Sequence, residues 1–231
     1  MAGLTADHEN FAIKSHFGIF AQQHKIACVF PDTSARNTGI EGIKDDWAFG
    51  EGAGYYVNAT NPKYSKHFNM SSYINEELPA IVNAHFHTDP DRKSITGFSM
   101  GGMGALASYL KNEGEFRSVS AFSPVSHPSE CAWGKNAFEK FFGSVEDGKE
   151  FDPTLLVKSY QGPKTPILID QGSDDKFTKE KQLLVEDFLE AAHKAGVKVD
   201  FRHREGYNHS FFYISSFISE HFEFHSRYLK A

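Results

Sequence analysis

The pentapeptide Gly97-Phe98-Ser99-Met100-Gly101 constrains this chain more than any other segment, and it directly follows the strand-like residues 94–96. A serine in this spacing stands on a sharp turn from a strand to a helix, which exposes its hydroxyl. The glycines are needed because side chains would clash in so tight a turn. By composition the pattern arises in about one in ten chains of this length, so a glycine-rich turn without chemistry is the alternative. The small residues of 102–107, which let a helix pack closely on a sheet, favour a nucleophilic Ser99.

Periodic segments along the chain predict strands that alternate with helices. Strands are expected at 26–30, 94–98, 118–122, 167–170 and 197–202, and helices at 10–24, 72–85, 100–111, 179–195 and 210–229. This alternation is typical of βαβ units around a mostly parallel sheet. Together with the Ser99 turn, it predicts an α/β-hydrolase fold with helices on both sides of the central sheet. Residues 30–66 form a long irregular stretch, which in a compact domain is usually functional or disordered.

Length and charge indicate a single domain and argue against several classes of binding partner. We expect residues 1–231 to form one domain, because the chain shows no internal repeat or linker. The 24 basic and 30 acidic residues give a formal charge of −6 without a basic cluster, which argues against nucleic acid or an anionic membrane as partner. Apolar runs are too short to cross a membrane, and the N-terminus does not resemble a signal peptide. Cys28 and Cys131 lack metal-type spacing, so reduced thiols in a cytoplasmic protein are expected.

A serine nucleophile needs a base, and the base needs an orienting acid. In this fold the order along the chain is Ser, Asp or Glu, then His. The predicted strand at 167–170 leads into Gly172-Ser173-Asp174-Asp175. We favour Asp175 as the acid because it lies past the turn, with Asp174 as its competitor. Asp170, inside the strand, is expected to be structural.

The base is expected in the loop after the last predicted strand, where His209 precedes an aromatic-rich helix. A helix cap or a surface role is the alternative for one histidine among 12. His85 and His87 form a pair without a third ligand, so we expect no metal site. The oxyanion hole requires two backbone N–H groups. Met100, after the nucleophile, supplies one, and the loop Gly3-Leu4-Thr5 is the segment suited to supply the other.

With these residues in place, the chain resembles the S-formylglutathione hydrolase (esterase D) family over its whole length. The matching segments are Gly3-Leu4-Thr5 with Asn10-Phe11, Pro31-Asp32-Thr33-Ser34, the run from Trp47 to Gly54, Glu76-Glu77-Leu78-Pro79, Gly97 to Gly102, 118–122, Trp133-Gly134-Lys135, 168–175 and Glu205-Gly206-Tyr207 with His209-Ser210. The resemblance implies a triad of Ser99, Asp175 and His209, with the Met100 and Leu4 amides as oxyanion hole. It also implies hydrolysis of a glutathione thioester in formaldehyde detoxification, with no cofactor.

The sequence departs from the family pattern in two places. Ala6 stands where family members usually carry a cysteine, so sensitivity to thiol reagents through this loop should be absent. The resemblance also implies three strands before the Gly3 loop that this sequence does not contain, which predicts a truncated hydrolase. Segments 26–30 and 94–98 would then face each other across an empty strand position. Because neighbouring strands lie about 4.8 Å apart, the gap would be about twice that unless the two segments close up or an outside segment fills it.

The proposed substrate has a minimal formyl group and a long glutathione arm. We expect a small acyl pocket, and Trp47, Tyr55 and Trp133 are candidates for contacts to the arm, each with simple packing as its alternative. Two other functions stay open. One is a general short-chain carboxylesterase that uses the same residues, and the other is a catalytically impaired product that binds a partner. The sequence does not fix the oligomeric state, and a homodimer is compatible with it.

Overall fold

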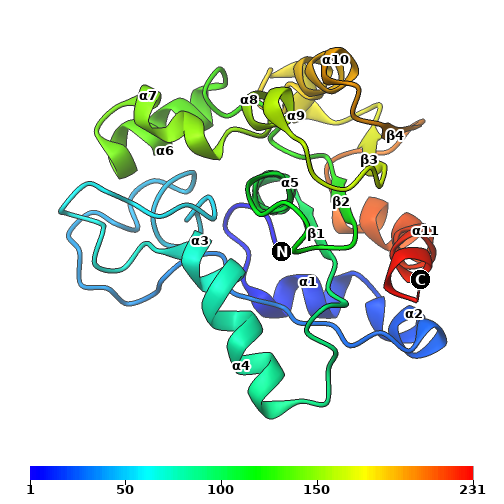
Figure 1. The fold of residues 1–231 in the computed structure, drawn as a ribbon. Coiled ribbons are helices and arrows are strands. Elements are labelled where there is room, and N and C mark those ends of the chain that lie inside the picture. Colours follow the sequence, from blue (N-terminus) through cyan, green and yellow to red (C-terminus); the bar gives the residue numbers. More distant parts are fainter. Residues whose placement is uncertain (231) are drawn as a thin grey trace.

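The computed structural model of the protein describes residues 1–230, in which a parallel sheet lies between helices (Figure 1). Its four strands run in the order β1 (Ile95–Phe98), β2 (Val119–Phe122), β3 (Ile167–Gly172) and β4 (Val199–Arg204), and every neighbouring pair is parallel. All residues of β2 and β3 are buried, as expected for strands covered on both faces. The α/β-hydrolase fold expected from the sequence is confirmed.

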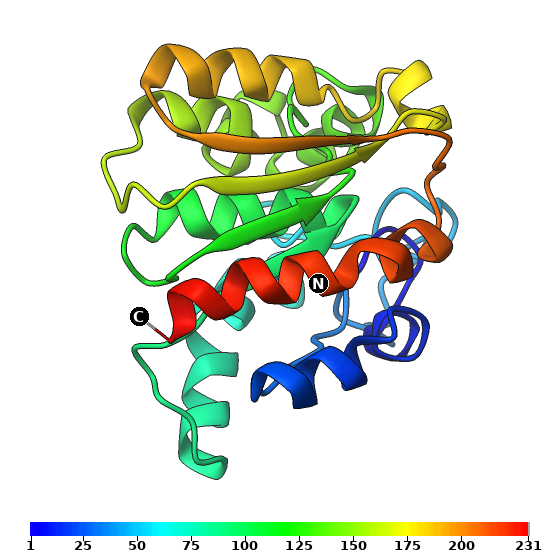
Figure 2. The same cartoon turned by 90° about the vertical axis from the view of Figure 1, so that its right-hand side faces the viewer.

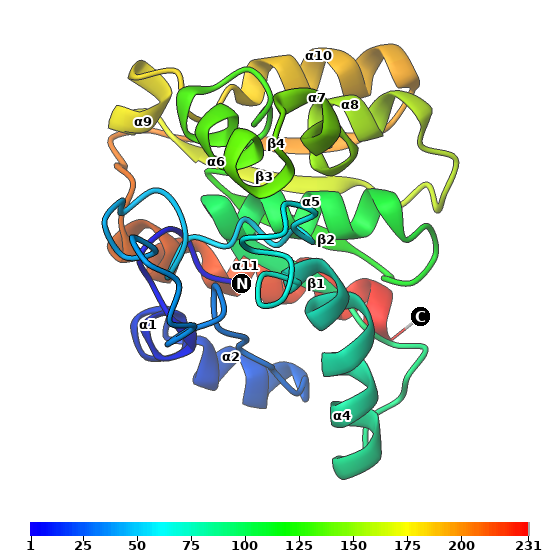
Figure 3. The same cartoon turned by 90° about the vertical axis from the view of Figure 1, so that its left-hand side faces the viewer.

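Helices cover both faces of the sheet. On one face, α11 (Phe211–Leu229) crosses β2 and β3 and contacts α1 (His8–Lys14) and α2 (Phe17–His24) (Figure 2). On the other face, α5 (Met100–Lys111) packs against β1 and β2, beside α8 (Pro153–Leu156) and α10 (Val185–Ala195) (Figure 3). The remaining helices are α3 (Met70–Ser72), α4 (Leu78–His85), α6 (Ala132–Phe142), α7 (Val145–Gly148) and α9 (Lys176–Lys179), with a π-helical turn at Tyr73–Glu77 and 3₁₀ turns at Lys149–Phe151 and Val157–Ser159.

Two expected helices are interrupted by residues in the left-handed region. The helix expected at 10–24 is two helices, α1 and α2, because His16 adopts φ 58° between them. The helix expected at 179–195 begins at Val185, after Lys181 and Leu184 adopt positive φ. Non-glycine residues seldom adopt such angles, and single-sequence periodicity does not reveal them. The helices α6, α7 and α8, between β2 and β3, were not predicted.

The prediction of a strand at 26–30 is wrong. This segment has no ladder partner within residues 1–230, and it forms one wall of a cavity of about 520 Å³ whose other wall includes Ser94, Ile95 and Thr96. The two segments therefore do not close up. At one end of the cavity Met1 pairs with β1: its amino group donates to the Thr96 carbonyl (2.8 Å), and its carbonyl accepts from the Phe98 N–H (3.1 Å). A strand forms only where a neighbouring strand accepts and donates its backbone hydrogen bonds, which explains why residues 26–30 form none.

The long stretch 30–66 is irregular, as expected, and is held by aromatic packing. Phe49 and Tyr64 contact Phe141 of α6, with ring centroids 4.6 and 5.8 Å apart. The Phe141 carbonyl also accepts hydrogen bonds from the backbone N–H groups of Thr60 and Asn61. These contacts hold the stretch against α6, beside the carboxyl ends of the strands.

Candidate active site

Ser99 lies on a strained turn between β1 and α5. Its backbone has φ 58° and ψ −119°, a region that costs a non-glycine residue about 1–3 kcal/mol. Hydrogen bonds on both sides hold this conformation: the Ser99 N–H donates to the Phe122 carbonyl (2.9 Å), and the Ser99 carbonyl accepts from the Met103 N–H (3.0 Å). The residue is 4% exposed. Strain retained in this way is typical of a residue placed for chemistry.

Three glycines make room for the turn. A side chain at Gly97 would overlap the carbonyl of Gly101, and one at Gly101 would overlap the carbonyl of Met1. Gly3 lies directly beside the nucleophile, since a β-carbon there would come within 3.0 Å of the Ser99 β-carbon and 3.6 Å of its Oγ. The spacing Gly-x-Ser-x-Gly is therefore a steric requirement of this fold. The same packing brings the loop after Gly3 to the serine.

Asp175 and His209 form a hydrogen-bonded pair at the carboxyl end of the sheet. Asp175 follows β3 and caps α9, because its Oδ1 accepts from the Phe177 N–H (2.9 Å). Its Oδ2 contacts His209 Nδ1 at 2.6 Å. Asp174, the competing carboxylate, is exposed, and its own backbone N–H donates to the Tyr207 carbonyl. Asp170 pairs instead with Arg204 at 2.7 Å inside the fold.

The Asp175 carboxylate is ionised although it is fully buried. Burial opposes the charge, but the hydrogen bond and charge of His209, together with the Phe177 N–H, hold the pKa of Asp175 below its ordinary value of 3.8. An ionised acid next to Nδ1 favours the imidazole form that carries its proton on Nδ1. The other ring nitrogen, Nε2, is then free to accept a proton.

Aromatic rings fix the imidazole of His209. Phe98, the residue before Ser99, lies 4.4 Å from its ring centroid, and Phe177 meets it edge-on at 4.8 Å with an interplanar angle of 87°. The imidazole is thus packed against the neighbour of the serine. The hydrogen bonds within residues 1–230 do not include one between Ser99 Oγ and His209. In enzymes without substrate this bond is often long and shortens in the substrate complex.

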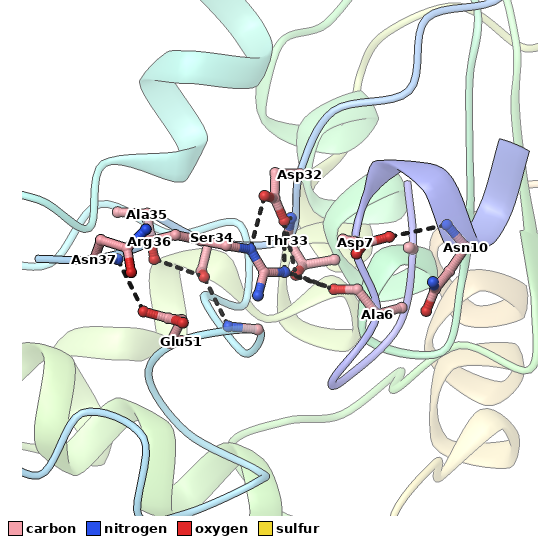
Figure 4. Close-up of polar contacts among 12 residues, drawn as sticks. Ala6, Asp7, Asn10, Asp32, Thr33, Ser34, Ala35, Arg36, Asn37 and Glu51 are labelled. Atoms are coloured by element: carbon pink, nitrogen blue, oxygen red, sulfur yellow. Dashed lines mark hydrogen bonds and ion pairs between the residues drawn. The ribbon is translucent and has the colours of Figure 1, made fainter.

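Two backbone amides beside Ser99 are free to donate. Within the described part of the chain, neither the Leu4 nor the Met100 N–H donates a hydrogen bond. The loop that carries Leu4 is anchored by two sets of hydrogen bonds. The Ala6 carbonyl accepts from Thr33 Oγ1 (2.6 Å) and Arg36 Nη2 (3.1 Å) (Figure 4). The Thr5 N–H donates to the Gly52 carbonyl (2.9 Å). Free amides on an anchored loop suit an oxyanion that develops in the reaction.

The three aromatic candidates for substrate contact are placed differently. Trp47 is 54% exposed and meets Trp133 edge-on at 5.3 Å, and Trp133 in turn contacts Phe177 at 4.7 Å. Trp47, Trp133 and Phe177 thus form a continuous aromatic row from the surface to His209. Tyr55 is fully buried in the core, where its hydroxyl donates to the Ala48 carbonyl (3.1 Å). Its ring therefore cannot contact a bound substrate, and we do not retain it as a candidate.

Two neighbours of Asp175 were missed by the sequence reasoning. Phe177 touches His209 through its ring and Asp175 through its N–H. Gln171, in β3, places its amide nitrogen 3.2 Å from Asp175 Oδ2. The available signal for Gln171 was a second polar residue, directly after Asp170, near the end of a strand that begins with three apolar residues. His85 and His87 belong to no group of three or more metal-ligating side chains among residues 1–230, and no described helix is long and apolar enough to cross a membrane.

Comparisons with known proteins identify the family of the chain. The model of the Esterase family matches residues 1–224. S-formylglutathione hydrolase of Mus musculus is 47% identical over all of this chain and 82% of its own length, and that of Arabidopsis thaliana is 42% identical over all of this chain and 81% of its own. A solved S-formylglutathione hydrolase from Agrobacterium tumefaciens superposes with a TM-score of 0.94 at 37% identity, covering 99% of this chain and 82% of that one. The chain therefore belongs to the S-formylglutathione hydrolase family of esterases.

Proposed function

We propose that this protein is a serine thioesterase that hydrolyses S-formylglutathione to formate and glutathione. The observation that carries the proposal is the pairing of His209 with Asp175 against Phe98, next to a serine held in a strained turn. Relatives that bear the name S-formylglutathione hydrolase match the whole chain at 42% and 47% identity and support the choice of substrate.

In the proposed acylation step, His209 Nε2 takes the Ser99 proton as Oγ attacks the formyl carbon. The developing oxyanion accepts hydrogen bonds from the Met100 and Leu4 amides, which are otherwise unused. The carbon–sulfur bond then breaks and the glutathione thiolate leaves, taking up the proton held by His209 Nε2, so that the imidazole is neutral again for the second step. A thiol with a pKa of about 8.5 needs less acid assistance than an alkoxide or an amine.

In the deacylation step, His209 removes a proton from water, which attacks the formyl-Ser99 ester. The second oxyanion uses the same amides, and Ser99 regains its proton as formate leaves. Asp175 stays ionised throughout and stabilises the imidazolium that forms in each step. The mechanism uses groups of this chain only.

The aromatic row from Trp47 to Phe177 supports a contact between these rings and the glutathione arm. Only the end formed by Phe177 touches His209, so the exposed end at Trp47 lies away from the reacting carbon. We therefore expect Trp47→Ala to raise KM for S-formylglutathione several-fold and to leave KM for p-nitrophenyl acetate, which lacks the arm, within two-fold. Equal effects on both substrates would remove Trp47 from the substrate contacts.

The second candidate function, a general short-chain carboxylesterase, is favoured by the match to the Esterase family. The ratio of kcat/KM for S-formylglutathione to that for p-nitrophenyl acetate separates the two functions. A thioesterase should prefer the thioester by at least ten-fold, and Ser99→Ala should abolish both activities. A ratio near one would favour the carboxylesterase. A folded chain that hydrolyses neither substrate and does not react with a serine-directed phosphonate would refute both.

A further inference from the structure

We propose that Gln171 is a positioning residue that holds the Asp175 carboxylate in the orientation required by His209. The proposal rests on the function proposed above. Gln171 does not touch the reacting groups, and it would act through Asp175 alone. Its contacts, its burial and the geometry of the carboxylate carry the inference.

The Asp175 carboxylate has three hydrogen-bond donors, shared unequally between its oxygens. Oδ1 accepts from the Phe177 N–H at 2.9 Å, while Oδ2 lies 2.6 Å from His209 Nδ1 and 3.2 Å from Gln171 Nε2. Phe177 and His209 together define the position of the group. Gln171 is the further donor on the oxygen that serves His209, so it restrains rotation of that oxygen away from the imidazole.

Gln171 is rigidly placed. It is 2% exposed and lies in β3, where its backbone pairs in register with His203 of β4. Its amide nitrogen also contacts Thr178 Oγ1 at 3.0 Å. A donor fixed to a central strand can orient a partner, because the strand cannot follow the movement of the partner.

The amide nitrogen of Gln171 faces Asp175, and this orientation leaves the amide oxygen without a hydrogen bond. Its Oε1 is buried and has no hydrogen-bond partner among the described residues. Exchanging the oxygen and nitrogen would bring Oε1 against the negatively charged Asp175, so the chemistry of the carboxylate fixes the orientation. A side chain that leaves one buried polar atom unsatisfied in order to donate to Asp175 is explained by a functional demand on Asp175.

The test compares Gln171→Met, which keeps length and removes the donor, with Thr178→Val, which removes the other side-chain partner of Gln171 and leaves Asp175 untouched. With p-nitrophenyl acetate, Gln171→Met should lower kcat about ten-fold, as expected for the loss of one hydrogen bond to a charged group, with KM within two-fold. Thr178→Val should leave both constants within two-fold. The downfield Nδ1–H proton resonance of His209 should shift in Gln171→Met and not in Thr178→Val.

A wild-type kcat together with an unshifted resonance in Gln171→Met would overturn the proposal. The resonance does not depend on turnover, and the wild-type assay with S-formylglutathione tests the proposed function separately, so the two failures are distinguishable. If Gln171→Met does not melt cooperatively, Gln171→Glu decides. The carboxyl that this variant introduces donates to Asp175 when protonated and repels it when ionised, so activity relative to wild type should fall at least ten-fold between pH 5 and pH 8. A constant ratio over this range would equally refute a positioning role.

Discussion

Replacing Asp175 with Asn tests the electrostatic reasoning about the site most directly. The substitution keeps the size of the side chain and its capacity to cap α9, since Asn and Asp cap helices about equally well. It removes the negative charge that faces His209 Nδ1 at 2.6 Å. The Asp175 pKa lies below 3.8, so the wild-type group is charged throughout the neutral range, and the whole charge is lost in the variant.

The expected magnitude follows from Coulomb's law. Opposite unit charges separated by 2.6 Å, or by about 4 Å if the charges are spread over both groups, attract by about 4–6 kcal/mol at an effective dielectric constant of about 20. Because this attraction exists only when His209 is protonated in the transition state, its loss should lower kcat by about 10³–10⁴-fold. The assay is hydrolysis of S-formylglutathione at pH 7.5, with thermal melting as the control for folding.

The matched variant is Asp174→Asn, which removes a charge one residue away. Asp174 is exposed and does not contact His209, so kcat should stay within two-fold of wild type. The reasoning is refuted if Asp175→Asn keeps more than a tenth of the activity, or if Asp174→Asn is the more damaging change.

Three further outcomes are expected. Ser99→Ala should abolish covalent labelling by a serine-directed phosphonate and keep the melting temperature within a few degrees; labelling elsewhere would identify another nucleophile. N-ethylmaleimide at pH 7 should leave activity unchanged, because burial raises the pKa of both Cys28 and Cys131 to about 11; rapid inactivation would contradict this. Burial and the charge of His221 lower the pKa of His225 to about 3, so below about pH 6.5 the unfolded chain binds a proton that the folded chain does not. The titration of His225 should therefore contribute a loss of stability of about 1.4 kcal/mol per pH unit from pH 6.5 towards pH 3, and His225→Gln should reduce the overall slope in pH-dependent thermal melts.

The sequence by itself determined the parts of the fold that depend on local patterns. The strands and helices that flank Ser99 carry apolar periodicity, and the glycines at 97 and 101 record a steric requirement that is visible in the residue order. The order Ser99, Asp175, His209 was predicted from the chain order of the triad in the α/β-hydrolase fold, and the loops at the carboxyl ends of a parallel sheet lie on one edge.

Only the tertiary structure decided features that depend on what lies beside a segment. Residues 26–30 have a strand-like composition, yet they form no strand because no neighbour takes their hydrogen bonds. Tyr55 was a candidate for contact to the substrate arm and is a core residue, because the irregular stretch folds onto α5 and α6. The donor that Gln171 directs at Asp175 was equally hidden, since hydrogen bonds between side chains depend on distances and orientations that only packing fixes. Local patterns select an element, and the partners brought by the fold decide what that element and its side chains do.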